Sequence, residues 1–271
     1  MKKENIKKGR TLVCGDIHGS HKGLKQCLER SYFDNEVDQL IQLGDVADGW
    51  PETPQCVDEL LKINNLIAIR GNHDQWTSEW MNTAYAGHHW LNCGGQATKQ
   101  AYEQARMYNE HDEDAHNKFF KYQHDYYVDD ENRGFVHGGF NSSKGLGHEN
   151  NRSDYYWDRD LWILAIMQDR KDLHEDFINH PSHSTRFYNH KELYIGHTST
   201  SNWKAKGNMK EYKDPNQKLN GPITVPMNRC NVWNMDTGAG FHGKVTIMDI
   251  DNKEYWSSDY CQDLYPEHEG R

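Results

Sequence analysis

Three apolar segments of this sequence each end in a glycine that is followed at once by a polar side chain of the metal-ligand type. The three junctions are 11–14 with Gly15-Asp16, 39–43 with Gly44-Asp45, and 66–69 with Gly71-Asn72. The apolar segments predict short strands, and the spacing of apolar residues over 21–30 and 53–63 predicts helices between them. In α/β sheets the functional groups gather at the carboxyl ends of strands. The alternation therefore predicts an α/β fold with all three junctions on one edge.

The second half of the chain repeats the arrangement with histidines. Predicted strands at 134–136 and 193–195 are followed by His137-Gly138 and Gly196-His197. The other expected elements are a helix over 153–168, a closing hairpin of 230–235 with 244–250, a helical cap or insertion over 98–130 and a long loop over 204–228. We expect one domain over residues 1–271, because the chain is long enough to bury a core of its own.

Six side chains in these motifs form a candidate metal-ligand set. Carboxylate and amide oxygens suit hard cations such as Mn²⁺ and Mg²⁺, whereas imidazole suits Mn, Fe and Zn. Taken singly, each residue is equally typical of a turn, a helix cap or a satisfied core histidine. Taken as an ordered set, they predict two divalent ions, Mn²⁺ first, with Fe, Zn or Mg as alternatives. The set is Asp16, His18, Asp45, Asn72, His137 and His197.

Charge and cysteine content limit the classes of partner and the compartment. The formal charge of −10 disfavours extensive nucleic-acid binding, since an acidic surface repels a phosphate backbone. The six cysteines are scattered and form no C-x-x-C pair, which argues against a zinc ribbon or a disulfide framework. We expect no secretory signal, no membrane segment and a cytoplasmic location. The sequence does not predict an oligomeric state.

The motifs resemble those of a known family. Gly15-Asp16-Ile17-His18-Gly19, Gly44-Asp45-Val46-Ala47-Asp48 and Gly71-Asn72-His73-Asp74 are similar to the three blocks of the calcineurin-like metallophosphoesterases, most of all to the phosphoprotein-phosphatase branch in bacteria and phages. Later segments match as well: Val136-His137-Gly138-Gly139, Gly196-His197-Thr198 and Asp236-Thr237-Gly238-Ala239. The resemblance runs from about Thr11 to Asp249.

The resemblance implies a role for each matched residue. Asp16 and His18 would hold the first metal, Asp45 would bridge both, and Asn72, His137 and His197 would hold the second. His73 would be the general acid that protonates the leaving oxygen, and Asp48 would orient it. A histidine with a carboxylate partner beside a metal site is also suited to proton transfer near neutral pH on general grounds. The implied fold is a layered α/β/β/α sandwich.

One departure from the family pattern concerns phosphate binding. The second block usually continues with Arg-Gly, and here it continues with Gly49-Trp50. A bidentate arginine binds phosphate oxygens well, so one expected phosphate contact is missing. Arg159 resembles the other phosphate-binding arginine of the family. Arg70 is a second candidate and Arg152 a weaker one.

Several neighbouring residues admit a structural interpretation. We expect Asp74 to hydrogen-bond backbone in its turn, and Trp50 to pack in the core rather than to stack on substrate. Arg159 is also compatible with an exposed helix charge. Among the remaining histidines, His242 is the most plausible addition to the site, because it follows the Asp-Thr-Gly-Ala segment.

Three functions remain open. The first is hydrolysis of a phosphomonoester through a metal-bridging hydroxide, as in a serine/threonine phosphatase acting on a phosphoprotein. The second is hydrolysis of a nucleotide phosphoanhydride, as in a diadenosine tetraphosphatase. The third is a non-catalytic, metal-dependent binding module. The His73–Asp48 pair argues against the third, since a binding module needs no general acid.

Overall fold

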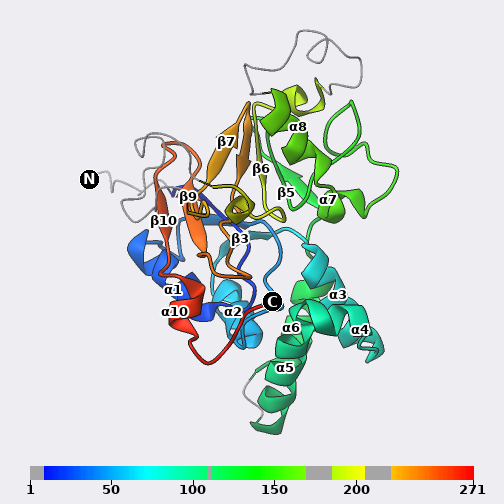
Figure 1. Cartoon of the computed structure of the whole chain (residues 1–271), viewed down its shortest axis with the longest axis vertical. Coiled ribbons are helices and arrows are strands. Elements are labelled where there is room, and N and C mark those ends of the chain that lie inside the picture. Colours follow the sequence, from blue (N-terminus) through cyan, green and yellow to red (C-terminus); the bar gives the residue numbers. More distant parts are fainter. Residues whose placement is uncertain (1–8, 109–110, 169–184, 205–220) are drawn as a thin grey trace, which may run out of the picture.

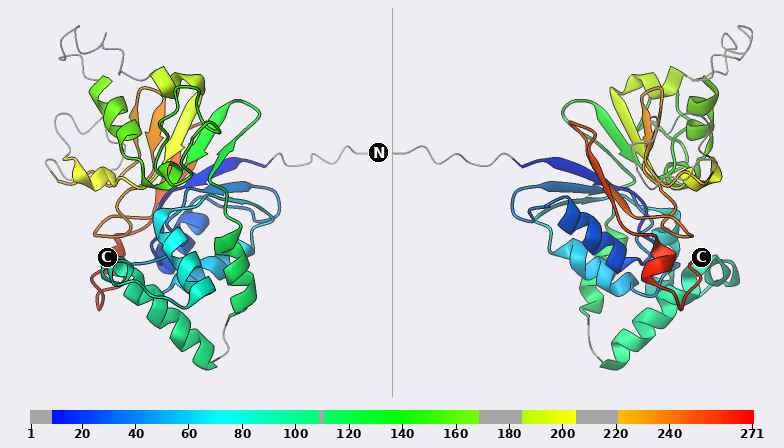
Figure 2. Two further views of the ribbon diagram at one scale, coloured as in Figure 1. Left: turned by 90° about the vertical axis from the view of Figure 1, so that its right-hand side faces the viewer. Right: turned by 60° about the vertical axis from the view of Figure 1, so that its left-hand side comes forward.

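The computed structural model describes residues 9–108, 111–168, 185–204 and 221–271 of the chain. Within these residues the fold consists of two five-stranded mixed sheets with helices on their outer faces. Figure 2 shows the two sheets lying against each other, with the helices outside them. This is the layered α/β sandwich that the sequence predicted.

The first sheet has the strand order β10-β9-β1-β2-β3. Strands β1, β2 and β3 run parallel, whereas β9 is antiparallel to both β1 and β10. Parallel strands end at the same edge, so the residues after β1, β2 and β3 meet there. The bounds are β1 Thr11–Cys14, β2 Gln39–Gln42, β3 Asn65–Ala68, β9 Thr246–Asp249 and β10 Tyr255–Ser257.

The second sheet has the order β4-β5-β6-β8-β7. Here β5, β6 and β8 run parallel, and β4 and β7 are antiparallel edge strands. The carboxyl ends of the three parallel strands again share one edge. The bounds are β4 Tyr126–Val128, β5 Arg133–Val136, β6 Glu192–Ile195, β7 Met227–Arg229 and β8 Val232–Asn234.

A core of apolar side chains joins the two sheets. Val13 and Ile41 of the first sheet and Phe135 and Tyr194 of the second belong to one cluster and are all fully buried. The Phe135 and Tyr194 rings are stacked, with centroids 4.9 Å apart. Burying large aromatic side chains removes much apolar area from water with few residues. This interface fixes how the two edges with the polar residues face each other.

Helices cover both outer faces. Against the first sheet lie α1 and α2, whose buried faces join a second cluster, and against the other sheet lie α7 and α8. The helical bounds are α1 His21–Arg30, α2 Thr53–Leu61, α3 Asn72–Thr83, α4 His88–Trp90, η1 Leu91–Gly95, α5 Gln96–Tyr108, α6 Glu113–Lys121, α7 Asp154–Trp157, α8 Asp160–Gln168, η2 Thr185–Asn189, η3 Thr200–Asn202 and α10 Cys261–Leu264.

The expected helical insertion is present but differs in extent. Helices α5 and α6 extend away from the sheets (Figure 1) and pack on α2 and α3. The predicted range 98–130 was too long, because β4 at Tyr126–Val128 pairs with β5. A three-residue strand is too short for a clear alternation of apolar and polar residues, so local patterning does not predict β4.

Three other sequence expectations need correction. The predicted helix over 153–168 is two helices, because Asp158 adopts an extended backbone with ψ 135° between them. The predicted hairpin does not form: β8 pairs with β6 and β7, whereas β9 pairs with β1 and β10 in the other sheet. The helix α3 that starts at Asn72 was not anticipated. Most of the expected loop over 204–228 lies outside the described residues, and β7 occupies its end.

Candidate metal centre

The six predicted ligands meet between the two sheet edges. Asp16 and His18 follow β1, Asp45 follows β2, and Asn72 begins α3 after β3. From the second sheet, His137 follows β5 and His197 follows β6. All six side chains are at least 97% buried, as the exposed fractions of 0–3% show. The sandwich therefore brings together residues that are up to 181 positions apart in the sequence.

Four functional candidates have an unusual backbone. His18, Asp45, Asp48 and His197 have positive φ angles of 51°, 55°, 73° and 66°. Non-glycine residues in this region cost on the order of 1 kcal/mol or more each, and such residues cluster at functional sites. The strain is consistent with a loop geometry that is selected for side-chain position rather than for stability.

Two glycines allow the loops to approach the carboxylates closely. A Cβ atom at Gly71 would lie 2.1 Å from Asp45 Oδ1, and one at Gly196 would lie 2.3 Å from Asp16 Oδ1. Neither position could carry a side chain without displacing a carboxylate. Glycine is therefore required at these two positions, because any larger residue would collide with a candidate ligand.

Asp45 lies at the middle of the cluster. Its Oδ2 atom is 3.5 Å from His18 Nε2 and 3.3 Å from His137 Nε2. Asn72 Oδ1 is 3.3 Å from His137 Nε2, and Asp16 Oδ2 is 3.7 Å from His18 Nε2. Two groups of potential ligands share Asp45: one with His18 and His73, the other with His137 and His197. A shared carboxylate between two groups is the arrangement that a pair of neighbouring ions requires.

Backbone hydrogen bonds orient two of the imidazoles. His18 Nδ1 donates to Ala47 O at 3.1 Å, and His137 Nδ1 donates to Leu43 O at 2.8 Å. Each bond leaves Nε2 as the nitrogen with a free lone pair. Outer hydrogen bonds of this kind are typical of metal-binding histidines.

The atoms that face the centre lack protein partners. His18 Nε2, His197 Nε2 and Asp45 Oδ2 are buried and have no hydrogen-bond partner among the residues that the structure describes. Buried polar atoms without partners are costly, so native sites of this kind are filled by an ion or water. The residues present therefore fit divalent cations.

The charge distribution also favours cations. Burial raises the pKa of Asp16 and of Asp236 to about 7. Burial alone would raise the pKa of Asp45 as well, but the nearby His137 holds it well below its usual value. Several carboxyl groups are thus gathered where their charges oppose one another, and bound cations would relieve that repulsion.

His73 and Asp48 form the expected pair. His73 Nδ1 donates to Asp48 Oδ2 at 2.8 Å, and the same oxygen accepts from Trp90 Nε1 at 2.7 Å. Burial lowers the pKa of His73 to about 3 and raises that of Asp48 to about 7. The remaining nitrogen, His73 Nε2, faces the centre and contacts the guanidinium of Arg271.

The two predicted substrate arginines differ in surroundings. Arg159 Nη1 donates to His197 O at 2.8 Å and to Thr198 Oγ1 at 3.0 Å, so its guanidinium lies beside the cluster. Arg70 is buried and donates to Gln75 and to the Lys121 and Gln123 carbonyls. These contacts favour a structural role for Arg70 in holding the insertion.

Two structural interpretations from the sequence agree with the contacts. Asp74 accepts from the Val46, Ala47 and Gly71 backbone N–H groups. Trp50 is fully buried, donates to Ala239 O at 2.6 Å and stacks on Tyr265.

Sequence reasoning missed other residues at the centre. Asp236 belongs to the Asp-Thr-Gly-Ala segment, from which the sequence predicts no role for it. Trp76 and Trp157 pack edge to face beside His73 and His197, respectively. Arg271 had no local motif that could have marked it.

Comparison with known proteins defines the class. Residues 9–248 match the family model described as calcineurin-like phosphoesterase. The match covers most of the chain, and the chain belongs to the calcineurin-like phosphoesterase family.

Individual relatives show local similarity. The chain is 40% identical to serine/threonine-protein phosphatase 1 of Salmonella typhimurium over 63 residues, which are 23% of this chain and 29% of that protein. It is 37% identical to the symmetrical bis(5'-nucleosyl)-tetraphosphatase of Pseudomonas entomophila over 65 residues, 24% of this chain and 23% of the other. The chain thus spans less than a third of the length of these relatives.

A solved metallophosphoesterase from Sphaerobacter thermophilus shares the whole fold. The TM-score is 0.53 at 16% identity, and the alignment covers 96% of this chain and 94% of the other. At this identity the likeness establishes the fold alone.

Proposed function

We propose that this protein hydrolyses a phosphomonoester, in the manner of a serine/threonine phosphatase. The observation that carries the proposal is the His73–Asp48 pair beside an Asp45-centred cluster with three unpartnered ligand atoms. Asp16 and His18 would hold one divalent ion, Asn72, His137 and His197 the other, and Asp45 both. When bound, two such ions supply Lewis acidity and lower the pKa of water. Mn²⁺ is the proposed metal.

His73 is the proposed proton donor for the leaving oxygen. Its Nδ1–H is held by Asp48, so the ring orientation is fixed and Nε2 is the nitrogen that faces the substrate space. Burial keeps the free ring neutral, and a phosphate group beside it would favour the protonated form. Proton uptake by His73 would then accompany substrate binding.

Arg159 is the proposed phosphate contact. Its position beside His197 would allow one guanidinium to face both the bound phosphate and the metal centre. Arginine suits this task because its donors match phosphate oxygens in pairs. Arg70 is a weaker proposal, since its Nη1 and Nη2 atoms already donate to three protein acceptors.

Nucleotide hydrolysis is the second candidate. Its support is the local similarity to the tetraphosphatase of Pseudomonas entomophila, which is 37% identical over 65 residues. The ligand cluster is compatible with this reaction too, because hydrolysis of a phosphomonoester and of a phosphoanhydride can use the same two-metal chemistry.

Substrate profiling tests the proposal directly. Mn²⁺-supplemented protein is expected to release phosphate from a phosphoserine or phosphothreonine peptide faster than it cleaves diadenosine tetraphosphate. Faster cleavage of the dinucleotide would select the second candidate. Failure to hydrolyse either substrate, or p-nitrophenyl phosphate, would contradict both and favour a binding module.

We propose a cytoplasmic location. Among the residues that the structure describes, no helix is long and apolar enough to cross a membrane. The cysteines are all free, as expected in a reducing, cytoplasmic compartment.

A further inference from the structure

Arg271, the last residue of the sequence, reaches the metal centre. Its backbone N–H donates to Gly240 O at 2.9 Å, and its guanidinium lies 4.7 Å from the centre of the Phe241 ring. The neighbouring Gly270 packs on Trp50, where an added Cβ would lie 3.0 Å from the indole. These contacts hold the segment against the fold and direct the Arg271 side chain to His73 Nε2.

The guanidinium lies beside the place where the family's second block departs from its pattern. A Cβ atom at Gly49 would lie 3.6 Å from Arg271 Cβ, so the two residues are neighbours. Gly49 and Trp50 stand where the family usually has an arginine and a glycine. Arg271 therefore places a positive charge close to the position at which the family's arginine is missing.

The charges around Arg271 fit an anion. Arg271 contacts His73 Nε2, and Arg159 Nη1 donates to His197 O at 2.8 Å, so both guanidiniums lie beside the candidate metal centre. Arg271 Nε is buried with no acceptor among the described parts of the chain. Two guanidiniums and an unused donor therefore lie next to the histidine proposed as the proton donor. This arrangement favours binding of a dianionic phosphate, whereas without an anion the two positive charges repel each other.

We propose that Arg271 binds the phosphate group of the substrate together with Arg159, in place of the arginine that is absent at position 49. This inference rests on the proposed phosphatase function. It adds a second substrate-binding residue that no motif in the sequence marks.

An Arg271→Ala variant tests the inference. Its kcat/KM for p-nitrophenyl phosphate is expected to fall on the order of 10²-fold, the usual effect of removing one donor to a developing anion. Inhibition by inorganic phosphate and calorimetric binding of phosphate to the Mn²⁺-loaded protein should weaken in parallel. Arg271→Lys should recover only part of the loss, because an ammonium cannot bind two oxygens in parallel.

Arg30→Ala is the matched control, since it removes an equal charge at an exposed position that pairs with Asp259. Unchanged KM and phosphate binding in Arg271→Ala, with active wild-type protein, would overturn the inference but not the proposed function. A higher kcat/KM would also overturn it, because Arg271 would then block His73. Inactive wild-type protein would instead contradict the function itself.

A different observation concerns the base of the helical insertion. Asp58 of α2 faces two histidines: His116 Nε2 lies 2.9 Å from its Oδ1, and His111 Nδ1 contacts its Oδ2. The three ligand atoms lie within 4.8 Å of one another. They belong to none of the sequence motifs of the active site.

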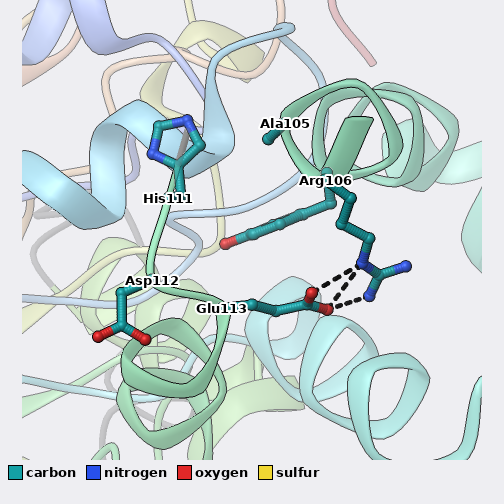
Figure 3. Close-up of a pocket in the computed structure, with 6 residues that line it drawn as sticks. Ala105, Arg106, His111, Asp112 and Glu113 are labelled. Atoms are coloured by element: carbon teal, nitrogen blue, oxygen red, sulfur yellow. Dashed lines mark hydrogen bonds and ion pairs between the residues drawn. The ribbon is translucent and has the colours of Figure 1, made fainter. Parts of the chain in front are cut away.

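The surroundings of these residues match a metal site. Tyr102 Oη lies 3.0 Å from His116 Nδ1 and can hold that ring with Nε2 toward the ligand group. His111 lines an open pocket of about 360 Å³, in which it lies across from the Arg106–Glu113 ion pair (Figure 3). The pocket provides an entry path, and the partly exposed Asp58 leaves room for a water ligand.

We infer that Asp58, His111 and His116 bind a zinc ion that fastens the insertion to α2. Two imidazoles, one carboxylate and a water complete the four positions that Zn²⁺ favours. This ion would link α6 and the segment before it to α2, and it would be separate from the two ions proposed for the active site.

The zinc content of variants tests whether Asp58, His111 and His116 bind an ion. Chelator-treated protein that is reloaded with Zn²⁺ and desalted is expected to hold about one zinc more per chain than Asp58→Asn or His111→Gln, as measured by inductively coupled plasma mass spectrometry. Asp58→Asn preserves side-chain size, so folding should persist, and circular dichroism checks it. The exposed His148→Ala is the control and should keep the full content. Equal zinc in the wild type and both variants would overturn the inference, leaving a hydrogen-bonded cluster.

Discussion

Replacing His73 with alanine is expected to lower kcat by about 10²–10⁴-fold, the range that one general acid contributes. Metal content should remain at the wild-type level, because His73 Nδ1 is engaged by Asp48 and six other side chains are available as ligands. Steady-state kinetics with a phosphoserine peptide, combined with mass-spectrometric metal analysis, measures both quantities on one preparation.

The dependence on the leaving group sharpens this experiment. A phosphoserine alkoxide needs a proton more than a nitrophenolate does, so the loss should be larger for the peptide than for p-nitrophenyl phosphate. His148→Ala, which removes an exposed histidine, should change neither rate. Equal losses on both substrates would argue against proton donation. A fall in metal content would instead identify His73 as a ligand, in keeping with its place beside His18 and Asp45.

Replacing Asp45 with asparagine is expected to remove most bound metal and to lower kcat/KM by about 10³-fold or more. Metal ions contribute several kcal/mol of transition-state stabilisation, and each 1.4 kcal/mol corresponds to a factor of ten. Asparagine keeps the size of the side chain. It also keeps an oxygen for the backbone N–H of His73, which in the wild type donates to Asp45 Oδ1 at 3.0 Å. The change therefore tests charge and bridging with little change of shape.

Metal titration with Mn²⁺ followed by calorimetry reads out the Asp45 variant. The wild type should bind ions that the variant does not, and high Mn²⁺ should restore part of the activity if affinity alone is reduced. Asp259→Asn, at an exposed position, is the control for losing one carboxylate. Retention of both ions and of activity in Asp45→Asn would contradict the bridging role.

The sequence predicted those parts of the site that are set by local patterns. Strand, glycine and ligand follow one another within a few residues at Asp16, Asp45 and Asn72, so each junction carries its own signal. The strand bounds 11–14 and the helix bounds 21–30 agree with the structure. The parallel order of the strands then brings the junctions together without further information.

Features that depend on contacts between distant parts of the chain cannot be predicted from local sequence patterns. Strand β9 pairs with β1 rather than with β8, and this pairing joins segments more than 230 positions apart in the sequence. Arg271 reaches His73 across 198 positions, and Asp58 meets His116 across 58. The left-handed backbone of His18 and His197 is likewise imposed by tertiary contacts, since local preference opposes it.

The division of the candidate ligands between the two sheets has a consequence for biogenesis. Neither sheet alone carries a full set for a second ion, because Asn72 and Asp45 come from one and His137 and His197 from the other. Uptake of that second ion would therefore stabilise only the docked arrangement of the two sheets, because its ligands meet only there. Nascent or partly unfolded chains would thus be catalytically silent, and amide exchange along the seam between the sheets should slow when Mn²⁺ is added.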